Sequence, residues 1–201
     1  MEPVKILVVI ANPNPESFSH AIAGTVSEAL VANGHEVVRH DLYAEKFDPV
    51  LPAVEITKDG EPDPAIKSYC DETAAAEGII VIHPNWWGQP PAILKGWVDR
   101  VLRQGVAYKF MPTDSGEGVP VGLLKAKSAI VLNTSNTPMA RELTVFGDPL
   151  ENLWGNCIFR LCGVLDFHRR SYGVIVTSTP EQRRAWLDDA RRLISKVFPR
   201  S

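Results

Sequence analysis

Two adjacent tryptophans, Trp86 and Trp87, lie in a segment rich in prolines, HPNWWGQPP at residues 83–91. Their rings are large, flat and stiff, and Pro84 and Pro90 restrict the backbone on either side. A fixed aromatic wall suits a planar heteroaromatic ligand, because ring stacking adds about 0.5–1.5 kcal/mol beyond the burial of apolar area. The alternative for a tryptophan is ordinary core packing, and we expect that of one of the two. The segment predicts a surface that binds a flat ligand.

Two other segments are polar and offer hydrogen-bond donors. NPNPESFSH at residues 12–20 carries hydroxyls at Ser17 and Ser19. It contains neither GxGxxG nor GxxxxGK[ST], yet the N–H groups at the start of a helix can bind phosphate. Ser17 acting only as a helix cap is the plainer interpretation. NTSNTP at residues 133–138 is small and uncharged, and it either donates to a polar ring edge or simply forms a tight turn.

The reactive side chains predict no catalytic group of their own. The five histidines show no spacing typical of metal ligands and no cysteine partner, so we expect no metal site. His83 ends an apolar run and is expected to be a hydrogen-bonded core residue. There is no GxSxG nucleophile elbow. Segments that suit a phosphate and a flat ring, with little reactive chemistry beside them, indicate that a bound cofactor carries the reaction.

The hydrophobic periodicity predicts the strands and helices that must position these segments. Along the chain, strand and helix patterns alternate five times. Continuous apolar runs such as VKILVVIA are typical of strands buried on both faces. Ser17, and Asp63 followed by Pro64, are expected to start helices. The expected strands are 4–11, 35–42, 78–83, 128–133 and one within 164–177; the expected helices are 17–34, 63–77, 91–102, 150–161 and 180–198; the expected loops and surface segments are 43–62, 104–127 and 134–148.

This alternation predicts where a ligand binds. Strands separated by helix-length connections pair in parallel, with helices on both faces of the sheet. In such sheets ligands bind at the carboxyl ends of the strands, where the strand order reverses. Residues 12–19, 84–90 and 133–137, which follow the first, third and fourth expected strands, are therefore predicted to form one site.

Composition places the chain among ordinary globular proteins and argues against several partners. Its 201 residues are 45% hydrophobic and 22% charged, with a formal net charge of −3. The absence of any lysine and arginine run argues against a nucleic-acid or anionic membrane partner. The three cysteines form no CxxC and are expected to be reduced and mostly buried. No apolar run is long enough to span a bilayer, so we expect a cytoplasmic protein.

Three longer motifs resemble a known family. PPAILKGWVDRVLRQGVAYKF at 90–110, ANPNPESFSHA at 11–21 and DLYAEKFDPVL at 41–51 are similar to motifs of the flavin-dependent NAD(P)H:quinone oxidoreductases of the DT-diaphorase and modulator-of-drug-activity type. The similarity covers nearly the whole chain up to the fifth strand. It implies an α/β, flavodoxin-like three-layer sandwich in a single domain, 1–201. Its five-stranded parallel sheet would have the order 2-1-3-4-5, with helices on both faces.

The resemblance also implies what the site holds. FAD, or alternatively FMN, would bind, and hydride would pass from NAD(P)H to a quinone or similar electrophile by a ping-pong mechanism. The expected partners are a small-molecule electron acceptor and a second copy of the chain, with the substrate pocket at the homodimer interface. The implied cofactor-binding residues are Asn12, Ser17, Phe18, Ser19, Pro84, Asn85, Trp86, Trp87, Gly88, Asn133, Thr134, Ser135, Asn136 and Thr137, and the implied substrate-pocket residues are Trp87, Tyr108, Phe110 and Phe146.

The chain departs from the family pattern at three places. The family's first-loop histidine is Asn12 here, and the glycines usual after the fourth strand are Ser135 and Asn136. A tyrosine and a histidine proposed to relay charge during hydride transfer correspond to Ala140 and Phe146. Backbone N–H groups after the fourth strand would then have to stabilise the reduced flavin.

Two alternative functions fit the same resemblance. One is a regulatory ancillary subunit of a potassium-efflux transporter, for which binding of flavin and nucleotide matters more than turnover. An exposed docking patch or co-purification with a membrane partner would distinguish it. The other is a one-electron carrier like flavodoxin, against which the small net charge of −3 argues, since such carriers are strongly acidic. The sequence does not distinguish FAD from FMN as the cofactor or NADH from NADPH as the hydride donor, and it does not identify the physiological acceptor.

Overall fold

A parallel sheet of five strands forms the centre of the molecule and has the predicted order. The computed structural model describes residues 2–57, 60–112 and 117–201. Its strands lie in the order β2-β1-β3-β6-β7, which is the predicted order 2-1-3-4-5 with two extra strands counted in the numbering. All four neighbouring pairs are parallel. The strands are β1 (Lys5–Ile10), β2 (Glu36–Asp41), β3 (Gly78–Pro84), β6 (Ser128–Thr134) and β7 (Asp166–Tyr172).

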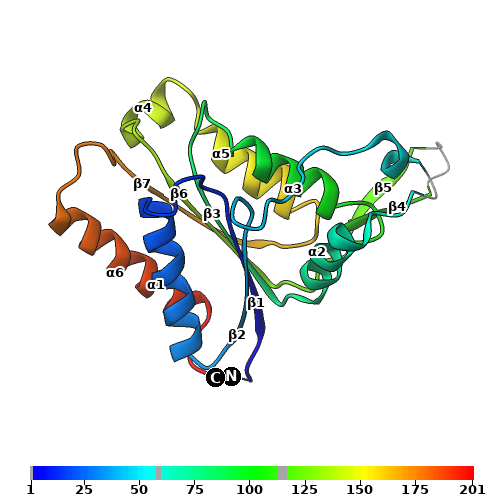
Figure 1. Cartoon of the computed structure of the whole chain (residues 1–201), viewed down its shortest axis with the longest axis horizontal. Helices are drawn as coiled ribbons and strands as arrows, with labels where there is room; N and C mark the ends of the chain where they lie inside the picture. The colour runs from blue at the N-terminus through cyan, green and yellow to red at the C-terminus, as the bar shows by residue number, and fades with distance from the viewer. Residues whose placement is uncertain (1, 58–59, 113–116) are drawn as a thin grey trace.

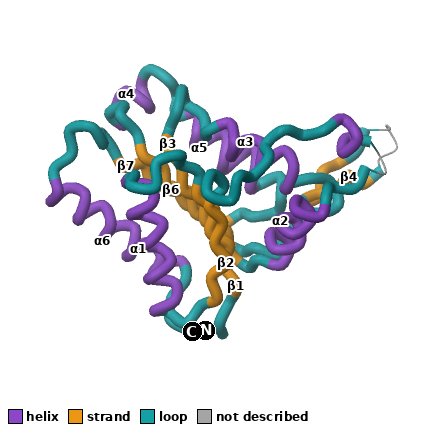
Figure 2. Tube along the Cα trace, in the orientation of Figure 1, coloured by secondary structure: helices purple, strands orange, loops and turns teal. Residues whose placement is uncertain are grey.

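Helices cover both faces of the sheet, as the periodicity predicted (Figures 1 and 2). All seven residues of β3 are buried, with Ile79 and Val81 in the apolar cluster on one face and Ile80 and Ile82 in the cluster on the other, which explains the continuous apolar run before His83. Ser17 and Asp63 cap α1 and α2 through their side chains, as predicted. No helix in the described part of the chain is long and apolar enough to cross a membrane. One face carries α1 (Phe18–Ala32) and α6 (Pro180–Val197); the other carries α2 (Pro64–Ala75), α3 (Ala92–Val101) and the helix that begins with α5 (Pro149–Glu151).

The helix predicted over residues 150–161 forms and buries Leu150, Trp154 and Ile158 as expected, but Cys157 and Leu161 of the predicted stripe are exposed. After α5 the chain continues as a π-helix, η2 (Asn152–Phe159). Its i→i+5 hydrogen bonds widen each turn and shift the side chains around the helix. Phe159 is therefore buried, whereas Cys157, expected in the apolar stripe, is exposed. The other two cysteines are buried and all three are free thiols, as predicted.

Two segments predicted as loops contain regular structure. Residues 104–127 hold an antiparallel hairpin, β4 (Tyr108–Met111) with β5 (Val119–Gly122), which projects beyond the helices in Figure 1. The hairpin strands are short and mostly exposed, and Pro120 removes a backbone donor, so neither run shows the pattern typical of a strand. A short helix, α4 (Met139–Thr144), follows β6.

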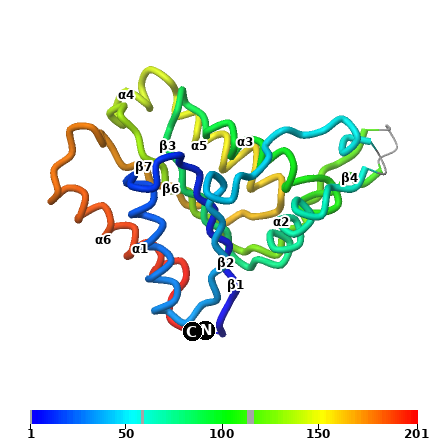
Figure 3. Tube along the Cα trace, in the orientation of Figure 1, coloured from blue at the N-terminus to red at the C-terminus, as the bar shows by residue number. Residues whose placement is uncertain are grey.

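Buried charges fix the segment between β2 and α2, drawn in cyan in Figure 3, against α3. It contains a 3₁₀ turn, η1 (Ala53–Ile56), whose buried Glu55 accepts from the buried guanidinium of Arg100 at 2.5 Å. Gly96 of α3 lies against Pro49, where a Cβ atom would come within 2.3 Å of the proline. The glycine of the AILKGW motif is therefore required for this close approach.

Candidate functional site

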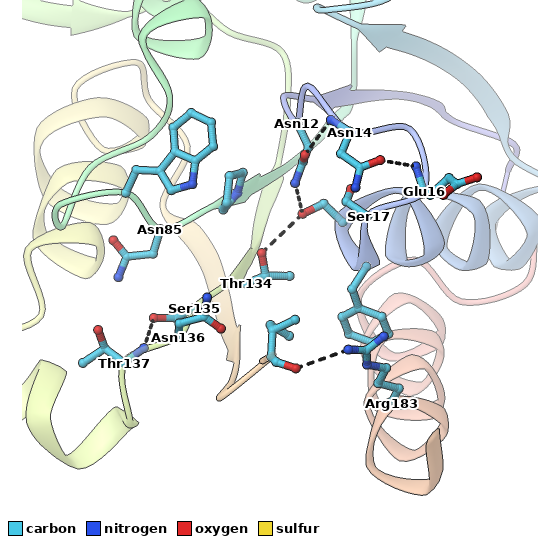
Figure 4. A pocket seen from close by; sticks show the side chains of 15 residues that line it. Asn12, Asn14, Glu16, Ser17, Asn85, Thr134, Ser135, Asn136, Thr137 and Arg183 are labelled. Atoms are coloured by element: carbon cyan, nitrogen blue, oxygen red, sulfur yellow. Dashed lines mark hydrogen bonds between the residues drawn. The ribbon is translucent and has the colours of Figure 1, made fainter. Parts of the chain in front are cut away.

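A cavity of about 400 Å³ opens at the carboxyl edge of the sheet, where β1, β3 and β6 end (Figure 4). This is the predicted position, because the strand order reverses here: β2 lies on one side of β1, and the next strand, β3, lies on the other side. The volume is typical of a small-molecule site. The residues that line it and were implied to bind the cofactor are Asn12, Ser17, Phe18, Ser19, Pro84, Asn85, Trp86, Thr134, Ser135, Asn136 and Thr137. Asn14 and Glu16, from the predicted segment 12–19, also line it, together with Ile175 and Arg183, which were not predicted.

The loop after β1 presents backbone donors to this cavity. Asn12 Oδ1 accepts from the N–H of Asn14 at 3.0 Å, and Asn14 Oδ1 accepts from the N–H of Glu16 at 2.9 Å, so two successive Asx turns lead into α1. Within the described residues no acceptor takes the N–H groups of Phe18 and Ser19. The first N–H groups of a helix lack intrahelical partners, and together with the helix dipole they favour an anion.

Arg183 of α6 adds a cation on the same side of the cavity. Its guanidinium lies 5.8 Å from the centre of the Phe18 ring, and its Nε donates to Ser178 Oγ at 2.8 Å. Across the described part of the chain no carboxylate pairs with it. Arg183 was not predicted from the sequence, although a cation so near the start of a helix opposes the helix dipole and is a usable signal.

The tryptophan segment is a tight turn, and it separates the two rings. Trp86 and Gln89 exchange both backbone hydrogen bonds at 3.0 Å, with Trp87 and Gly88 between them at φ values of 58° and 72°. Two positive φ angles make a type I′ turn, and a side chain in this region costs about 1–2 kcal/mol. Trp86 lines the cavity and is 43% exposed, whereas Trp87 points away and is fully exposed. The expectation that one ring packs into the core was wrong.

Asn85 lines the cavity, and its side-chain hydrogen bonds hold this turn in place. Its Oδ1 accepts from the N–H of Gly88 at 3.0 Å, and its Nδ2 donates to the buried Glu142 of α4 at 2.9 Å. Glu142 is a further residue that sequence reasoning missed, because nothing local links α4 to the turn.

The loop after β6 forms the floor of the cavity, and most of its donors are occupied. The N–H of Ser135 donates to the Tyr172 carbonyl at 2.9 Å, and the N–H of Thr137 donates to Ser135 Oγ at 3.0 Å. Only the N–H of Asn136 has no acceptor in the described residues. We expected several N–H groups of this loop to be available to a ligand, but only that of Asn136 is.

Asn133 is buried beneath the floor and does not line the cavity. Its Oδ1 accepts from Arg169 at 2.8 Å and its Nδ2 donates to Ser171 at 2.9 Å. Arg169 also pairs with Asp148 and Glu151, so it ties β7 to the start of the α5–η2 helix.

His83 is a satisfied core residue, as predicted. The indole N–H of Trp154 donates to His83 Nε2 at 3.0 Å, so the proton of the ring lies on Nδ1 and is donated to the Pro84 carbonyl at 2.8 Å. Burial lowers the pKa of His83 to about 4, and the nearby Arg169 adds to the lowering, while the bond to Pro84 opposes it. The imidazole is therefore neutral at physiological pH.

Known proteins resemble this chain along nearly its whole length. A family model described as “Flavodoxin-like fold” matches residues 4–195. The chain belongs to the flavodoxin-like fold family. An uncharacterized NAD(P)H oxidoreductase of Haemophilus influenzae is 34% identical over 187 residues, 90% of each chain. NAD(P)H dehydrogenase (quinone) 1 of Rattus norvegicus is 29% identical over 98% of this chain and 78% of its own. The structure of the NAD(P)H:quinone oxidoreductase from Methanothermobacter marburgensis is 25% identical, covers 98% of both chains and superposes with a TM-score of 0.83.

The substrate-pocket residues implied by resemblance do not reach the cavity within one flavodoxin-like chain. Tyr108 and Phe110 line a second cavity of about 1260 Å³ beside the hairpin, α3 and η2. Phe146 is 50% exposed and lies under the guanidinium of Arg141, 5.6 Å from its ring centre, on neither cavity wall.

The buried His83 predicts a pH dependence of stability. Because its pKa in the folded flavodoxin-like protein lies below the ordinary 6.5, the unfolded chain binds a proton that the folded one does not. Stability from this group is complete above pH 6.5 and is lost as the pH falls toward 4, by about 2 kcal/mol at pH 5. Urea unfolding at pH 7 and pH 5 measures the loss. His83→Gln should reduce it, His168→Gln on β7 should not, and equal losses in all three proteins would contradict the account.

Proposed function

We propose that the protein is a flavin-dependent oxidoreductase that moves hydride from NAD(P)H to a quinone or similar electrophile by a ping-pong mechanism. The observation that carries the proposal is one cavity that joins an anion subsite to an exposed aromatic face. The N–H groups of Phe18 and Ser19 and the Arg183 guanidinium line one side, and the Trp86 ring lines the other. The similarity to the Haemophilus, rat and Methanothermobacter proteins, each named as an NAD(P)H oxidoreductase or dehydrogenase, supports the reaction class.

The residues present fit a flavin nucleotide, FAD or FMN. Its phosphate would accept from Phe18 and Ser19 at the start of α1 and would balance the charge of Arg183. Its ring would stack beside Trp86, with the N–H of Asn136 at its polar edge. The Asx turns before α1 and the type I′ turn hold these groups in place before a ligand arrives, which lowers the cost of binding.

When bound, the flavin supplies an acceptor and then a donor of hydride. The chain itself positions the reactants and meets the charge that develops. Trp86 shields one side of the cavity from water, and the N–H of Asn136 is a donor that does not titrate. Ala140 and Phe146 cannot carry a proton, so no side chain at those positions relays one.

A homodimer completes the proposal. Tyr108 and Phe110 stack edge to face at 5.6 Å on a hairpin whose apolar side chains are largely exposed. Trp87 is also fully exposed on its strained turn. Exposed apolar side chains gathered on one hairpin are typical of an interaction surface, and a second copy would bring Tyr108 and Phe110 toward the partner's cavity. The exposed side chains that support this interface are Trp87, Phe110, Met111, Val119, Val121, Leu143, Val145 and Phe146.

The first test is cofactor loading and turnover. The purified protein should show a flavin absorption spectrum, the mass of the released cofactor should identify FAD or FMN, and NAD(P)H with quinone should give parallel-line kinetics. Ser17→Asp should weaken FMN binding by about tenfold or more, because it places a carboxylate against the phosphate while retaining a helix cap. Riboflavin has no phosphate, and its affinity should change less than about twofold, a difference well below one hydrogen bond.

The matched control adds the same charge elsewhere. Ser195 is exposed on α6, away from the cavity, and Ser195→Asp should leave both affinities unchanged. Wild-type protein that binds no flavin, or a Ser17→Asp variant that binds FMN as tightly as wild type, would contradict the assignment of this cavity.

The second test concerns the dimer. Sedimentation should show a dimer, and Tyr108→Ala should raise KM for the quinone about two- to tenfold, as expected for one ring contact of about 0.5–1.5 kcal/mol. The rate of flavin reduction by NAD(P)H should be affected less. A monomer that turns over at assay concentration would refute the shared pocket.

A further inference from the structure

Ser17, His20 and Asp41 form a chain of hydrogen bonds behind the cavity wall. Ser17 Oγ lies 2.9 Å from His20 Nδ1, and His20 Nε2 lies 2.9 Å from Asp41 Oδ2. Asp41 Oδ1 accepts from the N–H of Ala44 at 3.2 Å, which fixes the carboxylate. The side chains of His20 and Asp41 are 12% and 21% exposed, whereas Ser17 lines the cavity. An imidazole thus lies one hydrogen bond from the anion subsite.

The protons in this chain can be assigned by counting donors and acceptors. A carboxylate only accepts, so one proton lies on His20 Nε2 and is donated to Asp41. A second proton lies between Ser17 Oγ and His20 Nδ1. When the imidazole is neutral, it is the serine's own proton. When the imidazole is a cation, it is an additional proton on Nδ1, and the serine keeps its own. The neutral tautomer with its proton on Nδ1 is excluded, because its Nε2 lone pair would face the carboxylate at 2.9 Å.

The two allowed forms present different groups to the cavity. Ser17 Oγ also accepts from the N–H of His20 at 3.4 Å. With a neutral imidazole, the serine proton is donated to Nδ1, and the remaining lone pair of Oγ repels an anion. With an imidazolium, Oγ accepts from both Nδ1–H and the backbone N–H, and its own proton is free to donate to a phosphate oxygen. An anion at this position therefore favours the cation.

One carboxylate contacts the His20 ring and two more lie on neighbouring segments of the chain. Asp41, at the end of β2, contacts the ring directly, and Glu16 lines the cavity just before α1. Glu45, in the turn after β2, accepts from the N–H of Asp41 at 3.1 Å.

The other elements packed against α1 also carry charged groups. On β2, His40 is paired with Glu45 and Glu72 and does not contact His20. On α6, Asp189 is paired with Arg170 and Arg192. Arg183 of α6, beside Phe18, opposes a charge on His20.

The strand residues that pack against α1 and α6 carry no charge: those of β1 and β3 are apolar, and β6 adds the Thr134 hydroxyl, 3.3 Å from Ser19 Oγ. His83 of β3 faces Trp154 on the other side of the sheet.

We propose that His20 is a positioning residue for the cofactor phosphate and that phosphate binding and protonation of His20 are coupled. Binding draws one proton from solvent onto Nδ1, and the Ser17 hydroxyl turns from the imidazole to the phosphate. The coupling rests on the proposed function, because the phosphate is that of the proposed flavin nucleotide. The bound state holds the extra proton, so affinity is highest at low pH and falls as the pH rises.

Calorimetry of FMN binding measures the proton directly. Titrations of the apoprotein between pH 7.5 and 8.5, in two buffers of different ionisation enthalpy, give the number of protons taken up. FMN is fully dianionic there, since a phosphate monoester loses its second proton near about pH 6. Wild type should take up close to one proton per FMN, and its Kd should rise by up to about tenfold over this pH unit, the limit for coupling to one proton.

Three comparisons isolate His20. His20→Gln should take up no proton, and its Kd for FMN should stay nearly constant over the same range. His40→Gln is the matched control, because His40 lies on β2 between Glu45 and Glu72 and does not line the cavity; it should behave as wild type. Riboflavin, which lacks the phosphate, should bind wild type without proton uptake.

A measurement on the wild-type protein alone tests the coupling even if the His20→Gln variant fails to fold. Nitrogen NMR of the histidine side chains distinguishes protonated from unprotonated Nδ1, and at pH 8 His20 Nδ1 should be protonated only in the FMN complex. Equal proton uptake by wild type and His20→Gln, or an unprotonated Nδ1 in the complex, would overturn the coupling and leave the proposed function standing. A wild-type protein that binds neither FMN nor FAD would overturn both.

Discussion

The burial of β1, β3 and β6 on both faces is the constraint on which the rest of the molecule depends. A strand enclosed between two helical layers cannot carry an unpaired polar side chain, because burial without a partner costs about 1–3 kcal/mol. The first positions free of that constraint come where the strands end. Asn12, Asn85 and Thr134 stand at those positions, and parallel pairing brings all three to the same edge. The place of the cavity is thus a consequence of how the core is covered.

The polar side chains buried just below this edge have hydrogen-bond partners for their polar atoms. His83 is tolerated in β3 because Trp154 and the Pro84 carbonyl satisfy both of its nitrogens. Arg169 is tolerated because Asn133 and two carboxylates surround it. These contacts join β7, β6 and the α5–η2 helix beneath the floor of the cavity, so the groups above them are held by a rigid support rather than by the loops alone.

The sequence predicted those features that repeat with a fixed period, and it failed where one residue departs from its neighbours. Buried apolar runs and capped helices predicted the sheet order and the edge that carries the cavity. The π-helix was missed because one residue more in each turn leaves the apolar composition unchanged while exchanging Cys157 for Phe159 in the core. The outward turn of Trp87 was missed because tryptophan is a rare residue at positive φ. Arg183 and Glu142 reach the site from elements distant in the sequence, which no local pattern records.

The two ends of the cavity differ in how they would meet negative charge. At the aromatic end, the charge of a reduced ring would be met by the Asn136 N–H, and the positions of the family's relay residues hold Ala140 and Phe146, which do not titrate. At the anion end, Ser17 is joined to His20 and Asp41, and its hydroxyl can donate outward only when the imidazole is charged. A titrating group placed at the ring would make hydride transfer depend on pH, whereas one placed at the phosphate changes the cofactor's affinity. The loss of the relay and the presence of His20 would together move pH sensitivity from the chemical step to the retention of the cofactor.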